Sequence, residues 1–306
     1  MMGEMVAAFV RANLAAGAAI LVVMALRRFV RARFGPEVGY ALWAAPALAA
    51  LASLLPAREL LLPAGSALAE PSGLAAAGAA LQDPAFARIA TEAWAAGALV
   101  AASGVALFHL RFMKRAAQGL EGPALVGVVA PTLIVPSDFE QRFTAEERSL
   151  IRAHERMHMD RGDSIANALV ALVQVACWFN PLAHWAARAL RQDQELACDA
   201  AVIARRPGMR RRYAEALLKA QFGSAGLPFG CYWPAAGQHP LEERIGLLKQ
   251  QAPAAQRYLV GIVSVLAVAS ATAGGAWMAK PVHMIVQAVQ GPTAKPPPNM
   301  QFVIYR

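Results

Sequence analysis

The sequence predicts a mainly α-helical, multi-pass membrane protein with four transmembrane helices and one larger polar domain. Three observations lead to this fold class. Hydrophobic residues make up 57% of the 306 residues and charged residues only 16%, and the mean hydropathy is +0.39, whereas soluble domains are about half apolar. Four apolar segments approach the ~20 residues that a spanning helix requires. One long polar stretch, residues 114–257, separates the third segment from the fourth.

The apolar segments divide the chain into four parts. The segments are Val6–Leu26, Val38–Leu55, Trp94–Phe112 and Tyr258–Met278. The first does not resemble a cleaved signal peptide, because no basic region precedes it and four arginines follow it. The expected parts are residues 1–113 with three membrane helices and their loops, 114–257 as the polar domain, 258–279 as the fourth helix and 280–306 as a short tail.

Basic residues in the short loops predict the orientation. The first loop carries Arg27, Arg28, Arg31 and Arg33, and the third segment is followed by Lys114 and Arg115. Cytoplasmic loops carry an excess of lysine and arginine. We therefore expect the N-terminus and the tail to lie outside and the polar domain to lie in the cytoplasm.

The polar domain opens with a predicted β-hairpin and a helix. Pro123–Pro136 contains two short β-rich apolar runs separated by Ala130-Pro131, which is typical of a hairpin. This hairpin could pair with an extended peptide along its edge, or it could only cover the next helix. Thr144-Ala145-Glu146-Glu147 forms a capping-box pattern, so we expect a helix from there through His158.

A helical hairpin is expected after this helix. Ile165–Phe179 is apolar but too short for a full membrane span, so a buried helix or a shallow re-entrant segment fits better. Asn180-Pro181 ends this segment and opens a helix to about Arg205, because proline is tolerated in a first helical turn. The turn between the two helices can return Glu195 to the helix that carries His158.

The pattern H-E-x-x-H at His154–His158 predicts a metal site. Its two histidines stand four residues apart, so on a helix both imidazoles project from one face and can hold one ion. Glu195 and Asp199 are also four residues apart and share a face of the later helix. Two histidines and one carboxylate leave the fourth zinc position open for water, which is characteristic of a catalytic site.

The residues of this site receive distinct predicted roles. We expect His154, His158 and Glu195 to bind Zn²⁺, which lowers the pKa of a bound water towards ~7. Glu155 would be the general base that takes a proton from this water. Asp199 would accept a hydrogen bond from a ligating histidine.

Other polar residues near the motifs have less specific interpretations. Cys198 fits a small buried filler better than a ligand, and Asp163 fits a helix end or a supporting residue better than a ligand. The candidates for a second donor to the developing oxyanion are His184, Arg188, Arg191 and Tyr213.

The motifs H-E-R-M-H-x-x-R-G-D, W-F-N-P-L and E-L-A-C-D together resemble the BlaR/MecR family of membrane metallopeptidases, over roughly Pro123–Arg212. The resemblance implies a gluzincin-type zinc peptidase domain in the cytoplasm of a bacterium, with the chain in its inner membrane. It also implies signalling through loss of a winged-helix repressor, or through autocleavage. The best-known members carry a penicillin-binding sensor, but 28 residues follow Met278 here and neither S-x-x-K nor K-T-G occurs. Direct β-lactam sensing is therefore not expected.

Two other functions compete with a signalling peptidase. A housekeeping membrane protease of the HtpX or CAAX-protease kind shares H-E-x-x-H and E-x-x-x-D. The W-F-N-P-L segment nevertheless favours a signalling peptidase. A non-catalytic receptor scaffold would not need the intact Glu155. The expected partners are membrane lipids and a protein or peptide substrate, for which the resemblance suggests a winged-helix repressor. Direct nucleic-acid binding is not expected, and a homo-oligomer stays open.

Overall fold

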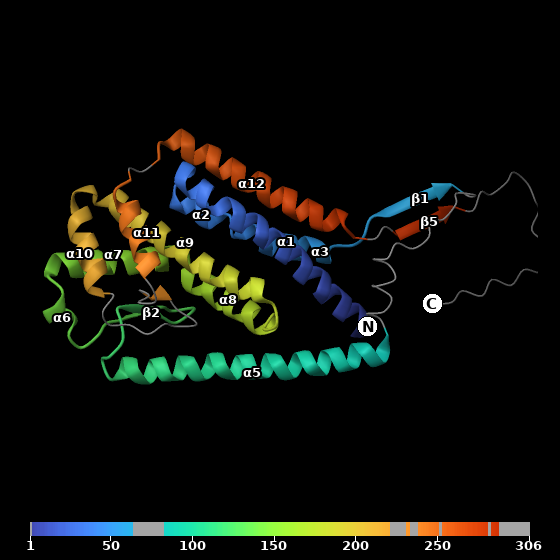
Figure 1. Cartoon of the computed structure of the whole chain (residues 1–306), viewed down its shortest axis with the longest axis horizontal. Helices are drawn as coiled ribbons and strands as arrows, with labels where there is room; N and C mark the ends of the chain where they lie inside the picture. Colours follow the sequence, from blue (N-terminus) through green and yellow to red (C-terminus); the bar gives the residue numbers. More distant parts are fainter. Residues whose placement is uncertain are drawn as a thin grey trace, which may run out of the picture.

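The computed structural model describes residues 2–63, 83–220, 231–232, 238–250, 253–280 and 283–287. Helices dominate these residues, and the strands form two small sheets. Helices α1 (Met2–Phe34), α3 (Ala44–Leu54) and α12 (Ala255–Met278) lie side by side, while α5 (Pro84–Ala117) runs along the opposite side of the molecule (Figure 1). Helices α8 (Asp163–Ala176) and α9 (Pro181–Arg205) lie between them (Figure 1).

The four predicted membrane segments all fall in helices long and apolar enough to cross a membrane. These helical stretches are Met2–Phe34, Pro36–Leu54, Pro84–Ala117 and Ala255–Met278. The second consists of α2 (Pro36–Ala41) and α3, which are separated by a turn at Leu42-Trp43. Pro46 explains the break, because it cannot donate a hydrogen bond to the carbonyl of Leu42 and is tolerated only in the first turn of α3. The prediction of four apolar helices is confirmed.

The predicted hairpin is also confirmed, but it belongs to a larger sheet. Strands β2 (Ala124–Val126) and β3 (Thr132–Ile134) pair antiparallel, and β4 (Cys231–Tyr232) pairs with the other side of β2. The β4 strand lies far along the chain, and the sequence did not predict it. Because β2 is paired on both sides, an extended peptide could add only to the outer edges of β3 or β4.

A second sheet connects two regions beyond the candidate spans. Strand β1 (Glu59–Pro63) pairs in parallel with β5 (His283–Gln287). The sequence predicted neither strand. Paired strands must lie on the same side of a membrane, so the loop after the second span and the tail after the fourth share one side. The rest of the tail, residues 288–306, lies outside the described residues.

The polar domain is built from short helices around one apolar core. Its remaining helices are α6 (Phe139–Arg142), α7 (Ala145–Arg161), the 3₁₀ helix η1 (Pro207–Met209), α10 (Arg210–Ala220) and α11 (Gln238–Leu248). The capping box at the start of α7 is confirmed, since Thr144 and Glu147 exchange side-chain to backbone hydrogen bonds. Phe143, Leu150 and Leu217 are fully buried members of the core that holds α7 in place.

The expectation of a buried helix over Ile165–Phe179 is wrong. Helix α8 exposes Ile165, Leu169 and Leu172, while Ser164 and Asn167 are buried. The polar side chains of α8 thus face inward, and its large apolar side chains face outward.

Candidate metal centre

Helix α7 positions the H-E-x-x-H residues with signals at both of its ends. The capping box begins the helix at Thr144, and Gly162 ends it in the left-handed conformation at φ 69°. Between these ends, His154 and His158 stand one turn apart, and both are buried. Helix α9 packs against α7 and is opened by Asn180, whose side chain accepts a hydrogen bond from a first-turn backbone N–H. This packing brings Glu195 to the two histidines.

Three candidate ligand side chains meet at one point. The Nε2 atoms of His154 and His158 are 3.1 Å apart. Glu195 Oε2 lies 3.3 Å from the first of these nitrogens, and its Oε1 lies 3.4 Å from the second. Tetrahedral ligands at ~2.1 Å from a zinc ion stand about 3.3 Å from one another. The donor set and its spacing therefore fit a zinc ion.

The opposite nitrogens of the two imidazoles are held by carboxylates. His158 Nδ1 lies 2.7 Å from Asp163 Oδ2. His154 Nδ1 lies 2.7 Å from the Tyr213 hydroxyl and 3.2 Å from Asp199 Oδ1. Such contacts orient each ring and set its tautomer. Both histidines thus present Nε2 to the same point.

Glu155 has a buried carboxylate without a protein partner. Among the residues that the structure describes, neither of its carboxylate oxygens has a hydrogen bond, although the side chain is almost fully buried. Burial raises the pKa of Glu155 above its ordinary value, while His154 and His158 act against this shift. Buried polar atoms in native proteins are almost always hydrogen-bonded. The two oxygens of Glu155 are therefore buried acceptors that the described residues leave without a hydrogen bond.

Arg244 of α11 holds the two acidic residues of α9. Its guanidinium donates to both oxygens of Asp199, at 2.7 and 2.8 Å, and lies 3.1 Å from Glu195 Oε2. Burial alone would raise the pKa of both carboxyl groups, but Arg244 and the histidines outweigh it. They hold the pKa of Glu195 well below its usual range and the pKa of Asp199 at about 2. Both carboxylates are therefore charged at neutral pH.

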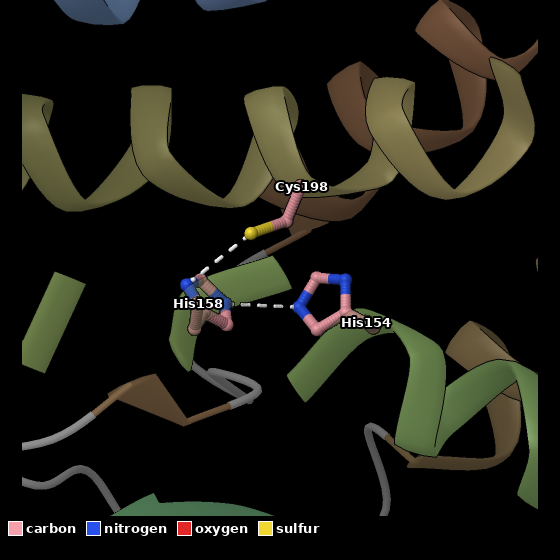
Figure 2. Close-up of side chains that lie close together, drawn as sticks. All are labelled: His154, His158 and Cys198. Carbon is pink, nitrogen blue, oxygen red and sulfur yellow. Dashed lines mark hydrogen bonds between the residues drawn. The ribbon is translucent and has the colours of Figure 1, made fainter. Parts of the chain in front are cut away.

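Cys198 is a competing ligand candidate. It forms a buried group with His154 and His158 in which one possible ligand atom from each lies within 4.8 Å of the others (Figure 2). However, its Sγ approaches His158 Nδ1, at 3.2 Å, and that nitrogen already contacts Asp163. Burial raises the pKa of Cys198 to about 11, whereas metals bind the thiolate. Glu195 fits the centre better, because its oxygens approach the Nε2 atoms of both histidines.

The candidates for a second oxyanion donor are not gathered at this centre. His184 contacts Gln174 and the carbonyl of Trp178, near the turn between α8 and α9, and Arg191 also binds Gln174. Tyr213 is close to the centre, but it contacts the Nδ1 side of His154. Arg244 is the cation that the sequence analysis missed. No motif marks it, because it comes from a separate helix that only folding brings next to α9.

Two residues, Tyr40 and Asp193, connect the centre to the candidate membrane helices through polar contacts. The Tyr40 hydroxyl in α2 donates to Asp163 Oδ1 at 3.1 Å and accepts from Gln194. On α9, the buried Asp193 accepts from Arg27 and Arg31 of α1 at 2.9 and 2.6 Å. Residues next to the candidate ligands thus contact both α1 and α2.

Comparisons with known proteins agree with these features. The family model of the BlaR1 peptidase M56 matches residues 7–248. The Regulatory protein BlaR1 of Bacillus licheniformis is 29% identical over 113 residues, which are 37% of this chain and 19% of that protein. The matched segment is thus about a fifth of the relative's length. No solved structure matches the chain.

The family match runs from the first candidate span through the candidate metal centre to the end of α11. It confirms the resemblance that the three motifs indicated. The chain, a membrane protein with a buried group of side chains that could hold a metal ion, therefore belongs to the BlaR1 peptidase M56 family of metallopeptidases.

Proposed function

We propose that this chain is an integral-membrane zinc metalloendopeptidase that acts in regulatory signalling. The observation that carries the proposal is the meeting of His154 Nε2, His158 Nε2 and the Glu195 carboxylate at 3.1–3.4 Å from one another. The buried, unpartnered carboxylate of Glu155 lies in the same helix turn. This is the arrangement expected for a hydrolytic zinc site that keeps one position open.

Different side chains bind the metal, transfer the proton and orient the ligands. His154, His158 and Glu195 would hold the zinc ion, which supplies a Lewis acid for the attacking water and the scissile carbonyl. Glu155 takes a proton from the water and passes it to the leaving amine. Asp163 and Asp199 hold the two imidazoles, and Arg244 keeps the carboxylates of α9 charged.

The substrate in this proposal is a cytoplasmic protein. The arginines of the first loop and the basic residues at the end of α5 favour a cytoplasmic polar domain in a bacterial inner membrane. The similarity to a protein named Regulatory protein BlaR1 favours signalling over housekeeping proteolysis. A winged-helix repressor or the chain itself is the substrate we propose. A scaffold role is disfavoured, because it gives no reason to bury Glu155 without a hydrogen bond from any of the described residues.

Glu155→Gln tests the mechanism. The variant keeps the size of the side chain but cannot take a proton, so zinc binding should survive while peptide hydrolysis falls by at least ~10²-fold. The measurement is cleavage of a candidate repressor, or self-cleavage, in membranes that carry each variant. Arg156→Gln is the matched control, because Arg156 is the exposed neighbour on the same helix. Unchanged processing in Glu155→Gln would overturn the proteolytic mechanism.

Reporter fusions test the orientation. A reporter placed after Arg115 should behave as cytoplasmic, and one placed after Lys280 as periplasmic, because the basic residues lie in the first and third loops. The reverse pattern would remove the cytoplasmic substrate from the proposal.

A further inference from the structure

We propose that α8 and the first half of α9 form a re-entrant hairpin, residues 163–190, whose turn is inserted into the lipid bilayer from the side of the metal centre. In this arrangement the exposed apolar face of α8 contacts lipid acyl chains. The hairpin is separate from the four candidate spans, and the proposal does not depend on peptidase activity.

Helix α8 is apolar on its outside and polar on its inside. Its exposed stripe consists of Ile165, Leu169, Leu172 and Val173. Each of these side chains exposes between 52% and 61% of its surface, and their spacing places them on one face. Ser164 and Asn167 are buried on the opposite face. A helix in contact with water has its polar residues outside and its apolar residues inside. Helix α8 has the reverse distribution, which suits contact with hydrocarbon.

The start of α9 lies at the same depth as the apolar part of α1. Asn180 Nδ2 donates to Asn13 Oδ1 at 3.3 Å, and Arg27 donates to the carbonyl of Ala189 at 2.8 Å. Residues 12–26 of α1, between these two contacts, carry no charged side chain. If that part of α1 lies in hydrocarbon, the part of α9 beside it does too. Ten helical residues rise ~15 Å, about half of a ~30 Å hydrocarbon core.

The tip of the hairpin is joined to two candidate spans by aromatic side chains. Phe179 contacts Phe9 of α1, with ring centroids 6.2 Å apart, and Phe9 contacts Trp94 of α5 at 5.8 Å. Trp178 donates to the backbone carbonyl of Trp94. It also lies against Gly97, where an added Cβ would stand 2.1 Å from the indole. Figure 1 shows α8 and α9 filling the space between α5 and the helices α1, α3 and α12.

Charged residues mark where the hairpin leaves the lipid. No residue from 164 to 187 is charged, and the polar Gln174 and His184 contact each other inside the hairpin. The first charged side chain on α9 is Arg188, and Asp193 binds the arginines at the end of α1. Because α8 and α9 run antiparallel, Leu172 lies deeper than Ile165. The ligand Glu195, two residues beyond Asp193, then stands at the membrane surface, and a substrate must reach the centre there.

Lipid is the occupant that fits this face. The stripe stands at the depth of two candidate spans, it contains no charged or hydrogen-bonding side chain, and it continues into the exposed Trp178 and Phe179 at the tip. The α5 helix beside it also exposes its apolar side chains, with Leu99 and Val100 at 69% and 73%. The two helices thus both expose large apolar side chains.

Photolabelling of the unmodified chain in vesicles provides the first test. A phospholipid with a diazirine at the end of one acyl chain is activated, and the chain is digested with trypsin. The peptide Gly162–Arg188 should be labelled as strongly as Ile89–Arg111 of α5, while Tyr213–Lys219 of α10 should stay unlabelled. Labelling of the α5 peptide without the hairpin peptide would overturn the proposal.

Spin labels test the depth and separate lipid from a second copy of the chain. The full chain, with its three cysteines replaced by alanine, carries one new cysteine at Leu172, Ile165, Val100 or Arg156. Collision with oxygen and with a water-soluble nickel chelate is then measured. Leu172 should match the lipid control Val100, Ile165 should be intermediate, and Arg156 should report water.

Two outcomes of the spin-label test would overturn the proposal. Nickel collisions at Leu172 equal to those at Arg156 would place the face in water. Weak collisions with both reagents would mean that protein, such as a second copy, covers it. Val173→Cys serves the same purpose if Leu172→Cys does not fold, because both positions lie on the exposed stripe.

Discussion

His154 and His158 stand one turn apart on α7, yet their Nδ1 atoms contact different parts of the molecule. His154 faces Asp199 and Tyr213, and Arg244 completes a fully buried cluster made from α9, α10 and α11. His158 faces Asp163, which also contacts Tyr40 in a candidate membrane helix. Among the described residues, the contacts given for His154 come from the polar domain, whereas those of His158 lead partly to the membrane region.

Removal of a proposed ligand should have the largest effect. His154→Ala, His158→Ala and Glu195→Ala should each reduce zinc from about one ion per chain to nearly none, because each removes one of three protein ligands. Metal analysis at matched folding measures this, with Arg156→Ala as the control on the exposed side of α7. Full retention of zinc in Glu195→Ala would show that Glu195 is not a ligand. Cys198 would then be the next candidate for the third ligand.

Arg244, near His154, and Arg161, near His158, should contribute differently to the stability of the fold. Arg244→Met leaves two buried carboxylates without their partner, so it should lower the free energy of unfolding by ~3–5 kcal/mol. On the other side, Arg161 forms an ion pair with Asp163, the residue that contacts His158. Arg161→Met should cost about 1 kcal/mol, because this guanidinium is a quarter exposed. Chemical unfolding of the metal-free chain in detergent measures both. Equal losses of unfolding free energy in the two variants would contradict the contrast between the buried cluster at His154 and the partly exposed one at His158.

The two carboxylates should affect metal affinity unequally. Asp163→Asn and Asp199→Asn should each weaken zinc binding by ~10- to 100-fold, the usual range for residues that orient a ligand. We expect the larger loss for Asp163→Asn, because Tyr213 still contacts Nδ1 of His154 when Asp199 is changed. Zinc competition with a chelator measures the ratio. If Asp199→Asn lost more zinc affinity than Asp163→Asn, Asp199 would be the more important of the two carboxylates for metal binding.

The smallest expected effect concerns the contact with the membrane region. Tyr40→Phe removes one hydrogen bond to Asp163, worth ~1 kcal/mol, and should weaken zinc binding by about fivefold. Tyr213→Phe is the comparison variant, because it removes the corresponding hydroxyl on the His154 side. If Tyr40→Phe leaves zinc affinity unchanged, the contact with α2 does not support the centre.

Local sequence signals account for the elements that carry the site. Thr144 and Glu147 satisfy the free N–H groups of the first turn of α7 through contacts three residues apart. Asn180-Pro181 begins α9 for a similar local reason. The four-residue spacings of His154 with His158 and of Glu195 with Asp199 then place each pair on one helix face. Short-range rules suffice for such features.

Long-range contacts decided the parts that the sequence did not predict. Arg244 reaches Asp199 from 45 residues away, and Tyr40 reaches Asp163 from 123 residues away. The pairings of β1 with β5 and of β2 with β4 likewise join distant segments. The sequence indicated that α8 is apolar. Which side of α8 is exposed depended on the positions of α1, α5 and α9.

Local sequence signals were sufficient for the number of apolar helices, the beginnings of α7 and α9, and the residue types of the candidate centre. These features depend on periodicity and capping, which involve neighbours within one or two helical turns. Only the tertiary structure decided which cation neutralises Glu195 and Asp199, which carboxylate supports His158, and which face of α8 is exposed. Burial and charge pairing set these features, because both depend on helices that are distant in sequence and adjacent in space.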